Sequence, residues 1–146
     1  MSRIFVSEGT GAGVYVFSDD HCPAHVHAWH RGEEWIARVS FSYVSSTIES
    51  MSIAPTRNVP LQRVVNRLLG DIAQRLSDCR RNWWMIRRTT CLTNQWAVVS
   101  EPGKIELLTE PRSQAKQITE TRYDPENESI HIAFREGTTT EVRVRP

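Results

Sequence analysis

Apolar and polar residues alternate along the first third of the chain, as they do in strands that bury one face. "VYVFS" (Val14–Ser18) and "HVHAW" (His25–Trp29) predict two strands on either side of a turn at Asp19–Pro23. "EEWIARVSF" (33–41) predicts a third strand, and "TIESMSI" (47–53) predicts a fourth, although the pattern does not decide which side of it is buried. These segments indicate an antiparallel β-meander.

From Pro60 onward, the apolar residues recur at spacings of three and four, which is the period of a helix with one buried face. The recurring positions are Leu61, Val65, Leu68, Ile72, Leu76, Cys79 and Trp83. A proline fits the first turn of a helix, so the pattern predicts one long amphipathic helix from Pro60 to Trp83. We expect this apolar stripe to cover one face of the meander, which gives an α+β fold.

The remainder of the chain returns to strand-like alternation, with turn-rich segments between the strands. The predicted strands lie in "TNQWAVVS" (93–100), "KIELLTE" (104–110), "QITETRY" (117–123), "SIHIAF" (129–134) and "TTEVRV" (139–144). They predict a C-terminal antiparallel β extension. We divide the chain into an N-terminal α+β domain, residues 1–90, and a β-rich segment, residues 91–146, which either stands apart or packs with the first as one domain.

Composition narrows the class of protein. The chain has 146 residues, 39% of them hydrophobic, and its first residues contain no apolar run of signal-peptide length, so we expect neither a secreted nor a membrane protein. Three cysteines, an odd number without a C-x-x-C pair, disfavour both a disulfide framework and a cysteine zinc site and favour a reducing cytoplasm. The net charge is only +1, but residues 57–100 carry eight arginines against two aspartates, so positive charge gathers in the middle of the chain.

Four of the five histidines fall within residues 21–30, in "HCPAHVHAWH". On a strand, His25 and His27 point to the same face, so two imidazoles can share one metal ion such as zinc, with His21 or Asp20 as the third ligand from the turn. Of the two, we expect the set His21, His25 and His27. Two other interpretations stay open. One is a histidine hydrogen-bonded to backbone in the sheet, and the other is a metal-free site for acid–base chemistry or phosphate binding, with His25 and His27 as the catalytic candidates.

A second candidate site lies at the end of the predicted helix, in "CRRNWWMIRR". Guanidinium groups hold phosphates, and an indole stacks on unpaired bases. The predicted polyanion-binding set is Arg80, Arg81, Arg87, Arg88 and Trp84. The alternative is an ordinary helix C-terminus, where arginines complement the helix dipole and Trp83 continues the apolar stripe into the core.

The segment around the histidines resembles a known bacterial family. "VYVFSDDHCPAHVHAWHRGEEWIARVSF", followed by a helix that ends at "NWW", is similar over residues 4–84 to the domain of unknown function 4160, which is marked by Asp-His-x-Pro-Pro-His-x-His. The matching residues are Asp20, His21, Pro23, His25 and His27, and Ala24 replaces the second proline. "KQITETRYDPENESIHIAFREGTTTEVRV" is weakly similar to the domain of unknown function 2442. The resemblance implies a small bacterial protein of a toxin–antitoxin-like pair.

These observations favour a cytoplasmic module that binds a protein partner or a small ligand through the histidine motif, without a cofactor, in a toxin–antitoxin-like or mobile-element accessory system. One alternative is an RNA-directed, toxin-like nuclease that uses His25 or His27, and another is a protein that binds a divalent metal ion. The sequence predicts no membrane association, leaves the oligomeric state open, and does not decide whether the protein is an enzyme.

Overall fold

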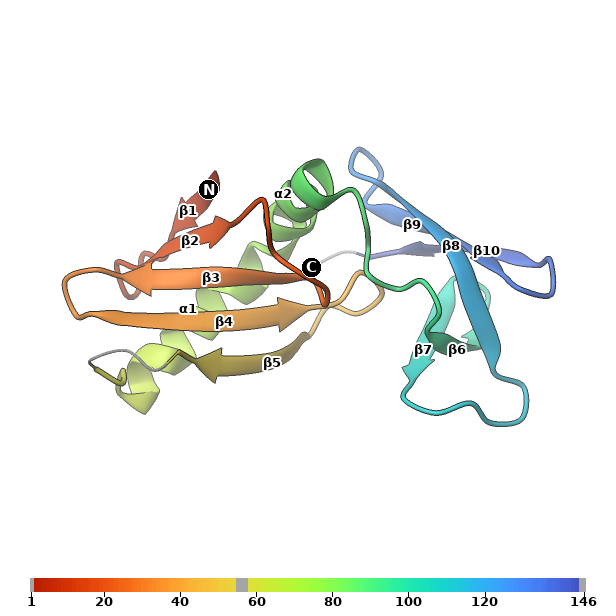
Figure 1. The fold of residues 1–146 in the computed structure, drawn as a ribbon, viewed down its shortest axis with the longest axis horizontal. Coiled ribbons are helices and arrows are strands. Elements are labelled where there is room, and N and C mark those ends of the chain that lie inside the picture. Colours follow the sequence, from red (N-terminus) through yellow and green to blue (C-terminus); the bar gives the residue numbers. More distant parts are fainter. Residues whose placement is uncertain (1, 55–57, 145–146) are drawn as a thin grey trace. The chain divides into compact units, whose positions relative to one another are not determined.

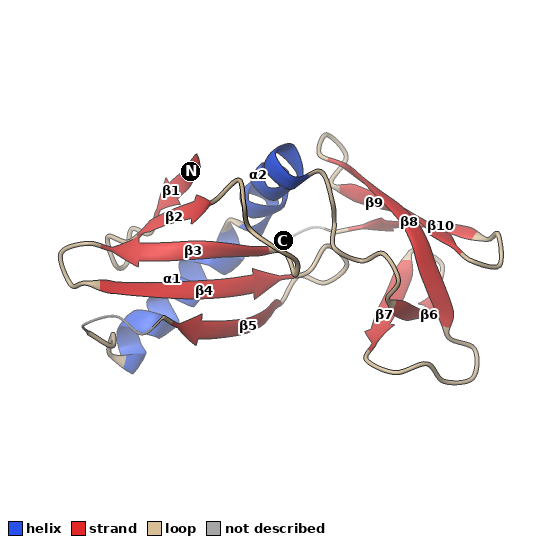
Figure 2. Cartoon of the chain, viewed as in Figure 1, coloured by secondary structure: helices blue, strands red, loops and turns tan. Residues whose placement is uncertain are grey.

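The computed structural model describes residues 2–54 and 58–144, which form two helices and two five-stranded antiparallel sheets, an α+β fold (Figures 1 and 2). The first sheet contains β1 (Ser2–Val6), β2 (Gly13–Val16), β3 (His25–His30), β4 (Trp35–Phe41) and β5 (Ile48–Ile53). The helices are α1 (Gln62–Gln74) and α2 (Leu76–Arg87). The second sheet contains β6 (Trp96–Glu101), β7 (Lys104–Leu108), β8 (Lys116–Asp124), β9 (Ser129–Phe134) and β10 (Thr139–Arg143).

The described residues divide into two compact units. The first comprises the chain up to Ser42 together with Ser46–Arg88, and the second comprises Tyr43–Ser45 and the chain from Thr89 onward. Each unit therefore has its own sheet, and both helices belong to the first. Neither helix of the described chain is long and apolar enough to cross a membrane.

The sheet of the first unit is a meander in which each strand pairs with the next along the chain. Strand β1, which the hydrophobic pattern did not predict, adds an edge next to β2. On one face, small and branched side chains from β2, β3 and β4 are fully buried: Val14, Val16, Val26, Ala28, Ala37 and Val39. The helices pass behind the sheet (Figure 1) and cover this face. The residues between these positions, among them His25 and His27, belong to the opposite face by strand alternation.

The prediction of one long helix is wrong, because the helix is broken at Arg75. That residue has φ −116° and ψ 23°, and its backbone N–H bonds to the carbonyl of Ile72, three residues back, which ends α1 before α2 begins. Leu61 was expected on the buried stripe but is 60% exposed, because it lies at the N-cap of α1, outside the helix. The remaining stripe positions are all buried on both sides of the break: Val65, Leu68, Ile72, Leu76, Cys79 and Trp83.

The second unit is built on the sheet ordered β10-β9-β8-β6-β7. The inward positions of β8, β9 and β10 alternate with polar outward positions, so the core takes every second residue. The buried side chains of this unit include Ile118, Tyr123, Ile130, Ile132, Phe134 and Val142. Tyr43, which belongs to this unit although it follows β4, packs edge to face on Tyr123 with ring centroids 5.0 Å apart.

Candidate metal centre of the first unit

The loop between β2 and β3 folds back on itself and presents the carboxylate of Asp20. The backbone N–H of Phe17 donates to Asp20 Oδ2 at 2.9 Å, and the N–H of Asp20 donates to the carbonyl of Phe17 at 3.2 Å. The second oxygen, Oδ1, is left for other partners. Asp20 is only 9% exposed, so these two backbone bonds fix a nearly buried carboxylate in one orientation.

Asp20 Oδ1 faces both motif histidines of β3. It lies 3.0 Å from His27 Nε2 and 3.4 Å from His25 Nε2. The two imidazole rings are 4.9 Å apart at an angle of 76°. One possible ligand atom from each of the three residues lies within 4.8 Å of the other two. The sheet and the preceding loop thus bring two nitrogens and one oxygen to a common point.

His25 is oriented by the turn that precedes its strand. The peptide bond between Cys22 and Pro23 is cis, and the carbonyl of Pro23 accepts a hydrogen bond from His25 Nδ1 at 2.7 Å. Since a neutral imidazole carries one N–H, this bond places the proton on Nδ1 and the lone pair on Nε2, toward Asp20. The ring is 2% exposed and lies 5.2 Å from the indole of Trp83 on α2. His25 fits the interpretation of a histidine bonded to backbone, and it also presents a free ligand atom.

The environment shifts the pKa of His25 and that of Asp20. The pKa of His25 lies below its ordinary value of 6.5, mainly because the ring is buried and also because the charge of Arg38 is nearby. The hydrogen bond to Pro23 and the charge of Asp20 raise this pKa, but burial outweighs them. Burial raises the pKa of Asp20, but the Phe17 amide and the contact with His27 outweigh it and leave that pKa below 3.8. Near pH 7 the centre therefore combines a carboxylate with a neutral His25.

The exposed residue His21 does not belong to this group of possible ligands within the described chain. The third possible ligand is Asp20, which the sequence analysis gave as the alternative to His21. His21 follows Asp20 directly, but only Asp20 is bonded to the backbone of Phe17. The predicted metal set His21, His25 and His27 is thus replaced by Asp20, His25 and His27.

The residues of the predicted polyanion-binding set differ in how deeply they are buried. Arg80 is 1% exposed and its Nε donates to the carbonyl of Ser42 at 2.9 Å, so its place in an exposed patch is a wrong prediction. Arg87 is half-buried and donates from Nη1 to the carbonyl of Ser18, which ties α2 to the loop that carries Asp20. Trp84 is half-buried, and Arg81 and Arg88 are exposed.

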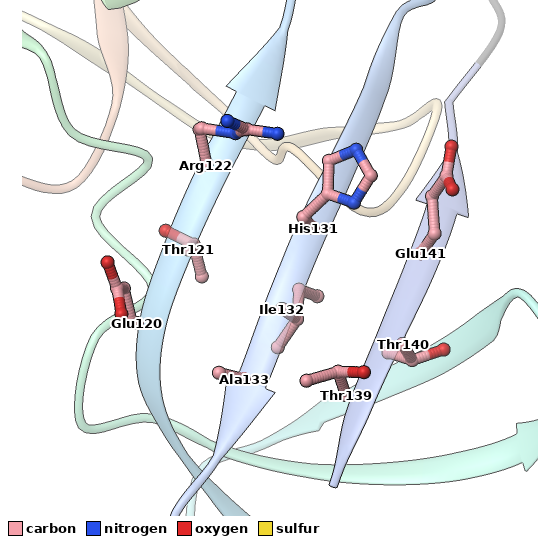
Figure 3. Close-up of a pocket in the computed structure, with 9 residues that line it drawn as sticks. All are labelled: Glu120, Thr121, Arg122, His131, Ile132, Ala133, Thr139, Thr140 and Glu141. Atoms are coloured by element: carbon pink, nitrogen blue, oxygen red, sulfur yellow. The ribbon is translucent and has the colours of Figure 1, made fainter.

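The fifth histidine, His131, lies in a shallow hollow on the second sheet (Figure 3). Cross-strand pairing places Arg122, His131 and Glu141 side by side on β8, β9 and β10, with the histidine between the two opposite charges. None of these three residues is buried, and the hollow is lined by strand residues alone. It offers no group of converging donors comparable to the one at Asp20.

No family model, no curated protein and no solved structure matches the chain.

Proposed function

We propose that the first unit is a ligand-binding module that holds a divalent transition-metal ion with Asp20, His25 and His27. The observation that carries the proposal is the convergence of one ligand atom each from Asp20, His25 and His27 within 4.8 Å of one another. Two imidazoles and a carboxylate form a set of nitrogen and oxygen donors that suits zinc, iron(II), cobalt or nickel.

The separations between the carboxylate oxygen and the two histidine nitrogens fit a single ion. Ligands bound to zinc at about 2.0–2.1 Å in a tetrahedron lie about 3.3 Å apart, and Asp20 Oδ1 is 3.0 Å from His27 Nε2 and 3.4 Å from His25 Nε2. The three donors all lie within 4.8 Å of one another, so binding an ion would draw the two imidazoles closer together. Hydrogen bonds behind the donors fit as well, because metal-binding histidines usually donate their other N–H to a carbonyl or carboxylate. The Pro23 carbonyl takes this place for His25, and the Phe17 amide holds Asp20. Three protein ligands leave a fourth position for water or substrate.

The direct test is calorimetric titration of untagged, chelator-stripped protein with Zn²⁺ at pH 7.5, supported by the visible absorption of the Co²⁺ form. We expect one ion per chain. His27→Gln should weaken binding by at least about tenfold, since even the loss of an outer-shell partner commonly costs that much. His27 is the ligand to change because its side chain is 22% exposed, so the substitution perturbs packing less than one at buried His25.

His21→Gln is the matched control, because His21 lies in the same motif, is exposed and is outside the donor group. It should bind Zn²⁺ as the unchanged protein does. Equal loss in the two variants, or stoichiometric binding that survives His27→Gln, contradicts the proposal.

A second candidate function, acid–base cleavage of RNA, is favoured by the bond between His27 and Asp20. If His27 Nε2 donates its proton to Asp20 Oδ1 at 3.0 Å, the carboxylate orients the ring and the other nitrogen is free to accept a proton. Such a site needs no metal. Cleavage of a labelled RNA in the presence of chelator that disappears in both Asp20→Asn and His27→Gln would support it, and cleavage that persists in either variant would exclude it.

The role implied by the motif resemblance, a protein partner in a bacterial toxin–antitoxin-like or mobile-element system, stays a prediction that the five motif residues alone support. The cytoplasmic location, expected from the cysteine pattern, also stays a prediction, and the disulfide-bonded state of Cys22 argues against a reducing compartment. The metal proposal does not depend on them, because it rests on donor geometry.

A further inference from the structure

The face of the first sheet opposite the buried valines and alanines carries aromatic rings and arginines in a regular pattern, and in the described chain only its His25 end packs on α2, through Trp83. One cross-strand row runs from Arg3 on β1 through Tyr15 on β2 and His27 on β3 to Arg38 on β4. Adjacent strands lie about 4.8 Å apart, so this row is about 14 Å long. Arg3 and Arg38 are exposed at its two ends, and Tyr15 and His27 are half-exposed between them.

The ring of Tyr15 lies flat along the sheet because the neighbouring position on its face is a glycine. A Cβ on Gly13 would come within 2.5 Å of Tyr15 Oη and 2.7 Å of Cε2, so the tyrosine covers the space that a side chain would fill. Phe17 lies 6.4 Å from Tyr15 and 4.7 Å from His27, measured between ring centroids. These neighbouring rings form a platform that is not coplanar, because Phe17 is tilted by 32° from Tyr15 and meets His27 edge to face at 78°. Tyr15 therefore gives the platform its flat stacking surface.

The charge of this face is positive. The guanidinium of Arg31 lies 4.4 Å above the ring of Trp29, next to Gly13 in the following cross-strand row, and adds a third cation to Arg3 and Arg38. Within strands β1 to β5, Glu49 is the only acidic residue, and it lies at the bulge of the edge strand β5. The platform is therefore flanked by guanidinium groups, and the carboxylate beside it, that of Asp20, is only 9% exposed and is engaged by His27.

We infer that this face binds single-stranded nucleic acid, with Tyr15 stacking on a base and Arg3 and Arg38 contacting phosphates. Four-stranded sheets with exposed aromatic residues bind two or three unpaired bases in this way, and stacking is tolerant of sequence. A duplex hides its bases from such a platform. An acidic protein satisfies the arginines but leaves the flat rings without a stacking partner, so unpaired nucleotides fit the combination better. The inference shares His27 with the proposed metal site but does not require a bound ion, because Tyr15, Arg3 and Arg38 lie outside the donor group.

The test is fluorescence anisotropy of labelled ten-nucleotide RNA and DNA strands, with chelator present so that no metal contributes. Tyr15→Leu should weaken binding at least about fivefold, and Tyr15→Phe, which keeps the ring, should bind as the unchanged protein does. The double variant Arg3→Gln/Arg38→Gln should reduce the slope of log affinity against log salt by about 1.4, since each phosphate contact on a single strand contributes about 0.7. Comparing the affinities for the RNA and DNA strands shows which of the two nucleic acids the protein prefers.

Arg63→Gln/Arg67→Gln is the charge-matched control, because it also removes two exposed arginines, but from α1, which lies outside this face of the sheet. It should leave the salt slope nearly unchanged. The inference is overturned if this control lowers the slope as much as the Arg3/Arg38 pair, if Tyr15→Leu binds as well as Tyr15→Phe, or if neither strand binds at low salt. Binding of duplex or of polyglutamate as tight as that of the single strands also overturns it, the latter in favour of an acidic protein partner.

Discussion

Adjacent residues of one type have opposite environments in this protein, as Arg80 and Arg81 show. Both are in α2, but Arg80 is 1% exposed with its Nε on the carbonyl of Ser42, and Arg81 is exposed. A buried guanidinium that loses its acceptor leaves an uncompensated charge, whereas an exposed one is solvated by water. Arg80 therefore contributes to the packing of the first unit, and only Arg81 is available to a ligand.

His25 should make the stability of the metal-free protein depend on pH. Its pKa in the folded state is below the ordinary value of 6.5, so the unfolded chain binds more protons as the pH falls through that value. The contribution of His25 is complete above pH 6.5 and is lost as the pH falls toward the folded pKa. We expect the free energy of unfolding in urea, with chelator, to decrease between pH 7.5 and 5.5.

The His21→Gln variant should show the same decrease, because His21 is exposed. An NMR titration of the His25 ring checks the cause directly and does not require a variant that folds. A His25 pKa at or above 6.5 would falsify this explanation. Asp20 acts in a separate and more acidic range, since its lowered pKa stabilises the folded state above about pH 3.8 and that contribution is lost as the pH falls further.

Single-residue predictions from the sequence succeeded where one local rule decides the outcome. Strand alternation alone places His25 and His27 on one face, and their rings are 4.9 Å apart. The choice between Asp20 and His21 depended on a backbone turn that no periodicity encodes. The burial of Arg80 had a signal that could have been used, since it lies four residues after Leu76 and three before Trp83, on the side of the apolar stripe.

At the scale of elements, the helical stripe decides which leucines stabilise the first unit. Leu68→Ala should lower the free energy of unfolding by about 2–5 kcal/mol, because Leu68 is 1% exposed and its truncation leaves a cavity. Leu61→Ala is the control, and should change it by no more than about 0.5 kcal/mol, since Leu61 is 60% exposed. Urea unfolding of both variants measures the difference. Equal losses would show that the stripe is not the buried face.

The elements themselves were predicted to different degrees, for physical reasons. Strands β2 to β4 alternate clearly because one face is buried and the other is not. Strand β1 was missed because its apolar residues, Ile4, Phe5 and Val6, are consecutive and do not alternate with polar ones, and its pairing with β2 is a tertiary contact. The break at Arg75 was missed because the apolar spacing continues through it, and arginine is an ordinary helix former.

At the scale of the whole molecule, each unit has its own core, so a destabilising substitution in one core should increase local unfolding mainly in that unit. Leu68 belongs to the first core and Ile132, which is 1% exposed, belongs to the second. In Leu68→Ala, we expect faster amide hydrogen exchange in β1 to β5 and the helices, with little change in β6 to β10. Ile132→Ala should give the reverse pattern. Mass spectrometry of exchanged peptides measures both, and a uniform response to either substitution would show one cooperative core.

The break at Arg75 has a consequence for how the chain tolerates insertions. An α-helix advances about 100° per residue, so the four-residue step from Ile72 to Leu76 keeps both segments at nearly the same rotational angle. Substituting Arg75 alters one side chain and preserves that angle. Inserting a single residue before Leu76 would turn α2 by more than a quarter of a revolution, carrying Trp83 away from His25 and Arg87 away from Ser18. The histidine centre is therefore sensitive to the length of the chain at Arg75, which follows His25 by 50 residues in the sequence.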